Sequence, residues 1–189
     1  VKNPSKPTEV GRWWYPGTKE GDSEPPVRRM PKFDSGYRAH NTNVYPERPD
    51  RAYIGYIDGG AVTLDISDRS RPKMVSNWRH SPPNTGFTHT SMPLISRNLL
   101  IVSDECTKDD GADWPKLTWV VDNRDETNPV PISTFPLPPV EVFAKRGGRY
   151  GSHNLHENYP SPLSKRSEKI ILATFFNGRD GAYASSIPY

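Results

Sequence analysis

The sequence has few of the features that would place it in several common classes. Cys106 is its one cysteine among 189 residues, so an internal disulfide is excluded, and without a nucleophile motif around it a buried, passive thiol is expected. No apolar run approaches the ~18 residues of a membrane-spanning helix. No signal peptide is recognisable, although Val1 is not an initiator methionine and processing or truncation can remove one. We expect a soluble protein, and the sequence does not distinguish a cytoplasmic from a periplasmic or secreted location.

Long runs of one charge are also lacking. The chain has 25 Lys and Arg against 22 Asp and Glu, and the two signs are interleaved. Its densest basic groups are Arg28-Arg29 and Lys145-Arg146 with Arg149. They are short and lie in loops rich in Pro and Gly, which predicts solvated loop charge and no nucleic-acid partner. A Gly-rich phosphate loop, G-x-S-x-G, H-E-x-x-H and C-x-x-C are absent, so these catalytic templates are excluded.

The sequence does contain short runs of aromatic and β-branched residues separated by turns. Its 21 prolines fall mostly between these runs, and few segments free of Gly and Pro are long enough for a helix. The length suffices for one domain with its own core. These features predict a single all-β domain over residues 1–189, with residues 15–37 as a long irregular connection within it.

One stretch, residues 38–78, looks like the unit from which the rest of the chain is copied. Four short strands are expected in it, at 39–44, 52–57, 61–66 and 73–78, with a tight Asp58-Gly59-Gly60 turn between the second and third. Four strands in roughly 40 residues is the size of one β-propeller blade. The sequence therefore predicts a propeller of four-stranded blades, with about three to four blades in this chain.

The second half of this unit recurs as P-x-x-[V/I]-x-x-[W/F]. A matched apolar residue and aromatic after a turn proline predict one outer strand, used three times with the same packing. The three copies are Pro7, Val10, Trp13; Pro72, Val75, Trp78; and Pro129, Ile132, Phe135.

The first half recurs more loosely, each time with a histidine before a pair of strands. These histidines are His40, His89 and His153. Because the first strand of a propeller blade is the innermost one, the three imidazoles are expected to meet at a central channel.

Both ends of the chain fall in the middle of a blade. Residues 1–14 overlay residues 66–79, and residues 181–189 stop before a last strand is expected. A propeller closes with about four to eight blades. We therefore expect the remainder of the propeller to come from the same longer polypeptide or from a second chain.

Histidines from separate strands suggest metal chemistry. Neutral imidazole is a common ligand of Zn, Fe, Cu and Mn, and three or four imidazoles leave a position for water or substrate. His40, His89 and His153 are the expected ligands, and His156 is a possible fourth. Glu105 or Glu157 would ligate the ion, hold a ligating imidazole or act as general base; Asp104 is a further carboxylate near a ligand.

Two functions follow, and the sequence leaves both open. The first is a metal-dependent enzyme that acts on a small organic substrate at the channel, by oxidative or hydrolytic chemistry. The second is a non-catalytic interaction or assembly module, in which the histidines are latches between blades and residues 15–37 form a contact surface.

Two further groups of polar residues are expected to be solvent-exposed and to have no role in a site. Asp109, Asp110 and Asp113 resemble loose Ca²⁺ ligands, but the spacing of a calcium loop is missing, which favours solvated acids. His80, just after the 73–78 strand, is expected to be an exposed loop residue.

The stretch GGAVTLDISDRSRPKMV (59–75) resembles the LVIVD-repeat proteins, whose units carry a glycine turn, an L-D-I-S-D type strand end and a following Pro. The resemblance extends to EVGRWWYPG, THTSMPL with IVSDE, and RYGSHNLHEN with ATFFNG; the motif is lost in residues 177–189. It implies a β-propeller and no particular activity. A more distant analogy, of fold and geometry alone, is to propeller oxygenases and oxidases that hold a metal on histidines, such as the carotenoid-cleavage oxygenases and the selenium-binding/methanethiol oxidase group.

Overall fold

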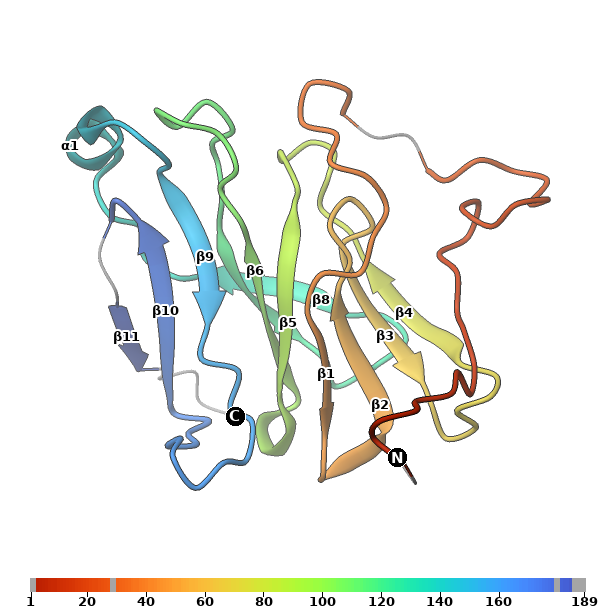
Figure 1. Ribbon diagram of the computed structural model, residues 1–189. Helices are drawn as coiled ribbons and strands as arrows, with labels where there is room; N and C mark the ends of the chain where they lie inside the picture. Colours follow the sequence, from red (N-terminus) through yellow and green to blue (C-terminus); the bar gives the residue numbers. More distant parts are fainter. Residues whose placement is uncertain (1–2, 28–29, 179–180, 185–189) are drawn as a thin grey trace.

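The computed structural model describes residues 3–27, 30–178 and 181–184. These residues form three antiparallel sheets that stand side by side, as predicted for an all-β chain (Figure 1). Residues 179–180 and 185–189 belong to the stretch in which the repeat motif is lost, and they lie outside the described ranges.

The first sheet contains the four strands expected for the repeated unit. They are paired in chain order as β1 (Thr42–Tyr45), β2 (Arg48–Gly55), β3 (Ala61–Asp65) and β4 (Lys73–Trp78). The turn between β2 and β3 needs glycine at Gly60, because its φ is 83° and a Cβ there would lie 2.3 Å from the carbonyl oxygen of Trp78.

The second and third sheets repeat this order. The second is β5 (Thr88–Leu94), β6 (Leu99–Asp104), β7 (Thr118–Asp122) and β8 (Val130–Thr134). The third is β9 (Gly151–Leu155), β10 (Ile170–Phe176) and β11 (Gly181–Ala184), with β10 in the middle.

Helical structure is confined to short connections. In the described ranges it comprises α1 (Val140–Phe143) and the 3-10 segments η1 (Ile95–Arg97) and η2 (Ala144–Arg146). No helix in this part of the chain is long and apolar enough to cross a membrane.

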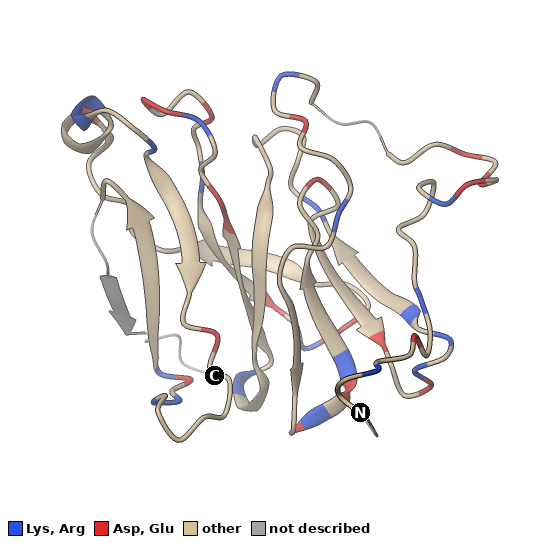
Figure 2. Cartoon of the chain, viewed as in Figure 1, with Lys and Arg blue, Asp and Glu red and all other residues tan. Residues whose placement is uncertain are grey.

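The second sheet is covered on both faces, which joins the three sheets into one packed body. Tyr45 and Tyr53 of the first sheet pack with Leu100 and Val102 of the second. On its other face, the second sheet packs Met92, Leu94, Leu99, Ile101 and Val120 against Leu155, Ile171 and Ala173 of the third. Burial of one such large side chain stabilises the fold by roughly 1.5–3 kcal/mol. Charged residues of both signs lie mainly in loops and at strand ends (Figure 2).

The amino-terminal segment differs from the expectation. Residues 8–15 form no strand, and Val10, the apolar position of the predicted outer strand, is 68% exposed. The segment crosses the turn at Arg69, where a Cβ on Gly11 would lie 2.2 Å from the Arg69 carbonyl oxygen, so it does not run along a strand edge. Its aromatic residues still pack, because Trp13 and Tyr15 lie against Tyr56 on the open face of the first sheet.

Of the two matched positions of the repeated outer strand, only the aromatic one therefore packs in the same way in each copy. Trp78 is partly buried and Phe135 is buried in the core, whereas Ile132 of β8 is 40% exposed. The described residues of 15–37 form turns and irregular segments without a helix or strand.

Candidate metal centre

The first strand of each sheet brings one histidine to the middle of the molecule. His40 lies two residues before β1, His89 lies in β5 and His153 lies in β9. The backbone N–H of Asn41 donates to the carbonyl of His89 across the gap between the first two sheets, at 3.3 Å. The ring centroids of His40 and His89 are 4.1 Å apart, and those of His89 and His153 are 5.0 Å apart. The structure thus brings the three predicted imidazoles together.

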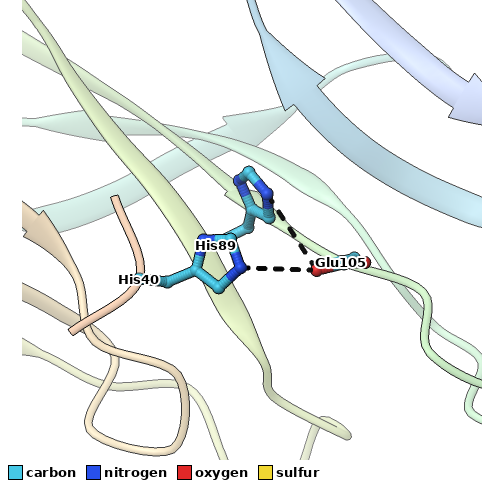
Figure 3. Close-up of side chains that lie close together, drawn as sticks. All are labelled: His40, His89 and Glu105. Carbon is cyan, nitrogen blue, oxygen red and sulfur yellow. Dashed lines mark ion pairs between the residues drawn. The ribbon is translucent and has the colours of Figure 1, made fainter. Parts of the chain in front are cut away.

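Glu105, which follows β6, lies among these imidazoles. Its Oε2 is 3.9 Å from Nε2 of His40 and 4.0 Å from Nε2 of His89. Its Oε1 is 3.7 Å from Nε2 of His153. Figure 3 shows His40 and His89 directed toward this carboxylate. One ligand atom from each of His40, His89 and Glu105 lies within 4.8 Å of the other two.

The Nδ1 atoms of two imidazoles are held by neighbouring side chains. Nδ1 of His40 is 2.8 Å from Oδ1 of Asn41, an atom that only accepts hydrogen bonds, so Nδ1 is the donor in this contact. Nδ1 of His89 is 2.6 Å from the Thr90 hydroxyl. Ligating histidines are typically held through their second nitrogen in this way.

Burial keeps the deeper imidazoles neutral. It lowers the pKa of His89 to about 3, helped by the neighbouring His40 and His153. Burial also lowers the pKa of His153, against the opposing effect of Glu105. Both rings are therefore in the form that binds metal ions at neutral pH.

The spacing of the four groups suits an ion better than direct contact. Separations of 3.7–4.0 Å are too long for hydrogen bonds between imidazole and carboxylate. Ligands of a tetrahedral ion with bonds of about 2.1 Å lie about 3.4 Å from one another, and Glu105 stands near that distance from each imidazole. His153 lies outside the group of ligand atoms that are all within 4.8 Å of one another.

Arg149 borders the site, and sequence reasoning had given it only the role of a loop charge. Its Nη1 is 3.0 Å from Oε1 of Glu105, and its guanidinium lies over the ring of Phe176. Phe176 in turn stacks on His153, with centroids 4.4 Å apart. No sequence signal links Arg149 to Glu105, because 44 residues separate them.

The structure does not bring His156 into this set. Its Nε2 lies 3.0 Å from the carbonyl oxygen of Lys165, beside a cleft of about 240 Å³ that Ile170 and Leu172 also line. Because side chains alternate along an extended strand, the residue three positions after His153 is directed to the opposite face.

Glu157 reaches the site only indirectly. Its carboxylate accepts a hydrogen bond from Nδ2 of Asn41, and its backbone carbonyl accepts one from the Tyr45 hydroxyl. Within the described ranges, no hydrogen bond or ion pair connects it to an imidazole.

Two expectations about polar residues outside the site are wrong. His80 is 8% exposed, because its ring packs between Trp78 and Trp119 and its Nε2 donates to Oδ1 of Asp104 at 2.7 Å. Asp104 therefore holds His80 and not a candidate ligand. Asp113 is also buried, unlike the exposed Asp109 and Asp110, because it accepts the Thr107 N–H and pairs with Lys116.

The prediction that Cys106 is buried is confirmed. The side chain is inaccessible, and burial raises the pKa of its thiol to about 11, so the reactive thiolate is disfavoured at neutral pH.

Comparison with known proteins identifies the repeat. The LVIVD repeat family model matches residues 50–79, a range that holds β3, β4 and most of β2. No curated protein and no solved structure matches the chain. The chain therefore contains an LVIVD repeat at residues 50–79, as the resemblance implied.

Proposed function

We propose that this chain holds one transition-metal ion on His40, His89, His153 and Glu105 and acts as a metal-dependent enzyme on a small organic substrate. The observation that carries the proposal is the arrangement of three imidazole Nε2 atoms, from three sheets, around one carboxylate. The donor set suits Zn, Fe, Cu or Mn.

The propeller architecture belongs to the same proposal. The three sheets are successive blades, and β1, β5 and β9 are their inner strands at the axis. The outer face of β10 leaves Ile170 and Leu172 each 48% exposed, whereas both faces of the second sheet are covered. A further sheet, from the same longer polypeptide or a second chain, would cover this face.

The site combines a protected interior with an accessible side. The His89 side chain is 4% exposed and that of Glu105 12%, but the His40 side chain is 35% exposed, so a small molecule can approach from the side of His40. A bound ion would act as Lewis acid and water activator for hydrolysis or, if redox-active, support an oxidation. Glu105 would hold or accept a proton, and Asn41 and Thr90 would fix the orientation of the imidazoles.

One observation favours a second candidate, a non-catalytic module with structural histidines. The ion pair with Arg149 already compensates the charge of Glu105, and the Asn41 to His89 hydrogen bond joins two sheets without any metal. In that case the imidazoles are latches between blades.

Metal analysis of purified protein separates the two candidates. The proposal predicts stoichiometric Fe, Cu, Mn or Zn in the wild type and in His156→Ala, and its loss in His89→Ala. A metal-free wild type, whose His40→Ala, His89→Ala and His153→Ala variants only melt at lower temperature, would establish the latch instead.

A further inference from the structure

Arg149 lies at the edge of the candidate metal centre, where it contacts Glu105 through one of its nitrogen atoms. Its Nη1 contacts Oε1 of Glu105 at 3.0 Å and the Cys106 carbonyl oxygen at 3.5 Å. Its Nε and Nη2 make no hydrogen bond within the described ranges, and its side chain is 43% exposed. The guanidinium is therefore a half-exposed cation with spare donors at the edge of the site.

The same carboxylate serves both Arg149 and the candidate metal centre, with Oε1 toward Arg149 and Oε2 toward His40 and His89. Oε1 of Glu105 faces Nε2 of His153 at 3.7 Å. A divalent ion bound there would share this carboxylate with Arg149 and repel the guanidinium, since both are positive and close together. Metal binding and the Arg149 to Glu105 ion pair are therefore opposed.

The charge of the loaded site then points to the substrate. An imidazole that binds an ion through its nitrogen lone pair is a neutral ligand, so the histidines add no charge to the loaded site. One carboxylate, one guanidinium and a divalent ion leave a net charge of about two positive units, which favours an anion. The planar guanidinium binds carboxylates through two parallel hydrogen bonds.

We propose that Arg149 competes with the metal for Glu105 and, when the metal is bound, turns its free donors to the carboxylate of a small organic acid substrate. This inference rests on the proposed metal site. Phe176 would keep the displaced guanidinium near the site, because the two already stack, with the guanidinium carbon 5.1 Å from the ring centroid.

The first test is zinc titration of the metal-free protein by calorimetry. In Arg149→Met, zinc affinity should rise about tenfold, since a charge-assisted hydrogen bond of about 1.5 kcal/mol no longer competes. Arg149→Lys keeps the charge but loses the planar fork, and should fall between wild type and Arg149→Met. Lys145→Met removes an exposed cation elsewhere in the same loop and should leave zinc affinity unchanged.

The second test uses propionate, with propionamide as its neutral counterpart, on the zinc-loaded protein. Propionate should bind about tenfold more weakly to Arg149→Met than to wild type, because a charge-assisted hydrogen bond is lost. Propionamide should bind to wild type and Arg149→Met with the same affinity. If Arg149 only stabilises the fold, Arg149→Met should lower the melting temperature and change neither the zinc affinity nor the propionate affinity.

The outcomes distinguish this inference from the function on which it rests. Absence of zinc binding by wild type and variants alike overturns the metal site, and the inference with it. Zinc binding by the wild type with unchanged affinity in Arg149→Met overturns the competition alone. Unchanged propionate affinity in that variant overturns the assignment of a carboxylate substrate.

Discussion

Two consecutive carboxylates at the end of β6 meet histidines in opposite ways. Asp104 is fully buried and makes direct hydrogen bonds, with Nε2 of His80 at 2.7 Å and Nε1 of Trp119 at 3.2 Å. Glu105 is directed elsewhere, its side chain is 12% exposed, and it stays 3.7–4.0 Å from three imidazoles.

The difference separates a structural contact from a site that can take a ligand. Burial raises the pKa of Asp104, opposed by the charges of His80 and Lys116, and its hydrogen bonds offset the cost of that burial. No space for an ion remains at a direct 2.7 Å contact. Around Glu105 the imidazoles stand back at 3.7–4.0 Å, as the proposed metal site requires, and the Nδ1 atoms of His40 and His89 are already held.

The largest expected effect concerns the buried pair. Asp104→Ala removes the partner of His80 and of the Trp119 indole, and should lower the free energy of unfolding by about 3–5 kcal/mol in urea denaturation. Glu9→Ala, which breaks an exposed ion pair with Arg12, should leave the free energy of unfolding nearly unchanged. If both variants lose a similar free energy of unfolding, the contacts of Asp104 do not stabilise the fold more than an exposed ion pair does.

The second prediction concerns the open site. His89→Ala should weaken zinc binding at least about 100-fold, because it removes a ligand together with its held orientation. The matched control is His156→Ala, which removes a histidine on the opposite face and should leave zinc affinity unchanged. Equal effects of the two substitutions would contradict the assignment.

A smaller change should follow from loosening one imidazole. Thr90→Val preserves the shape of the buried side chain but removes the hydroxyl 2.6 Å from Nδ1 of His89, and should weaken zinc binding about tenfold. Thr134→Val on exposed β8 is the control. Wild-type zinc affinity in Thr90→Val would show that the Nδ1 contact does not position the ligand.

The smallest expected effect is a difference in acid sensitivity. The pKa of His89 is about 3 in the folded protein and about 6.5 when unfolded, so between these values the unfolded chain binds a proton that the native protein does not. This contribution makes the free energy of unfolding fall as pH decreases through that window. In the presence of a chelator, the melting temperature of His89→Gln should therefore fall by a few degrees less than that of wild type between pH 6.5 and 4. Parallel curves would show that His89 is not buried as a neutral ring.

Local pattern was enough to predict the strands and the three inner histidines. The turn at Gly60, the short runs of aromatic and β-branched residues in β2 and β3 and the recurring histidine position all depend on residues close in sequence. The predicted amino-terminal strand is wrong because a strand pairs only where it runs along the edge of a neighbour, and the segment around Gly11 crosses the turn at Arg69 instead.

Such local patterns do not predict the partners of Asp104 and Glu105. Asp104 binds His80, 24 residues earlier, and Glu105 binds Arg149, 44 residues later, so neither pairing leaves a local signal. His156 was included as a ligand because it follows His153 closely, but the alternation of side chains along the strand separates the two. Among the predicted carboxylates, only Glu105 lies among the imidazoles.

The most direct test of the central claim is an X-ray absorption spectrum of the zinc-loaded protein. The account predicts one ion per chain, bound by nitrogen and oxygen at about 2.0–2.1 Å, with the scattering pattern of three imidazoles. It also predicts the loss of that pattern in His89→Ala. A shell of oxygen ligands with one imidazole or none would contradict the claim that the inner strands assemble a metal centre.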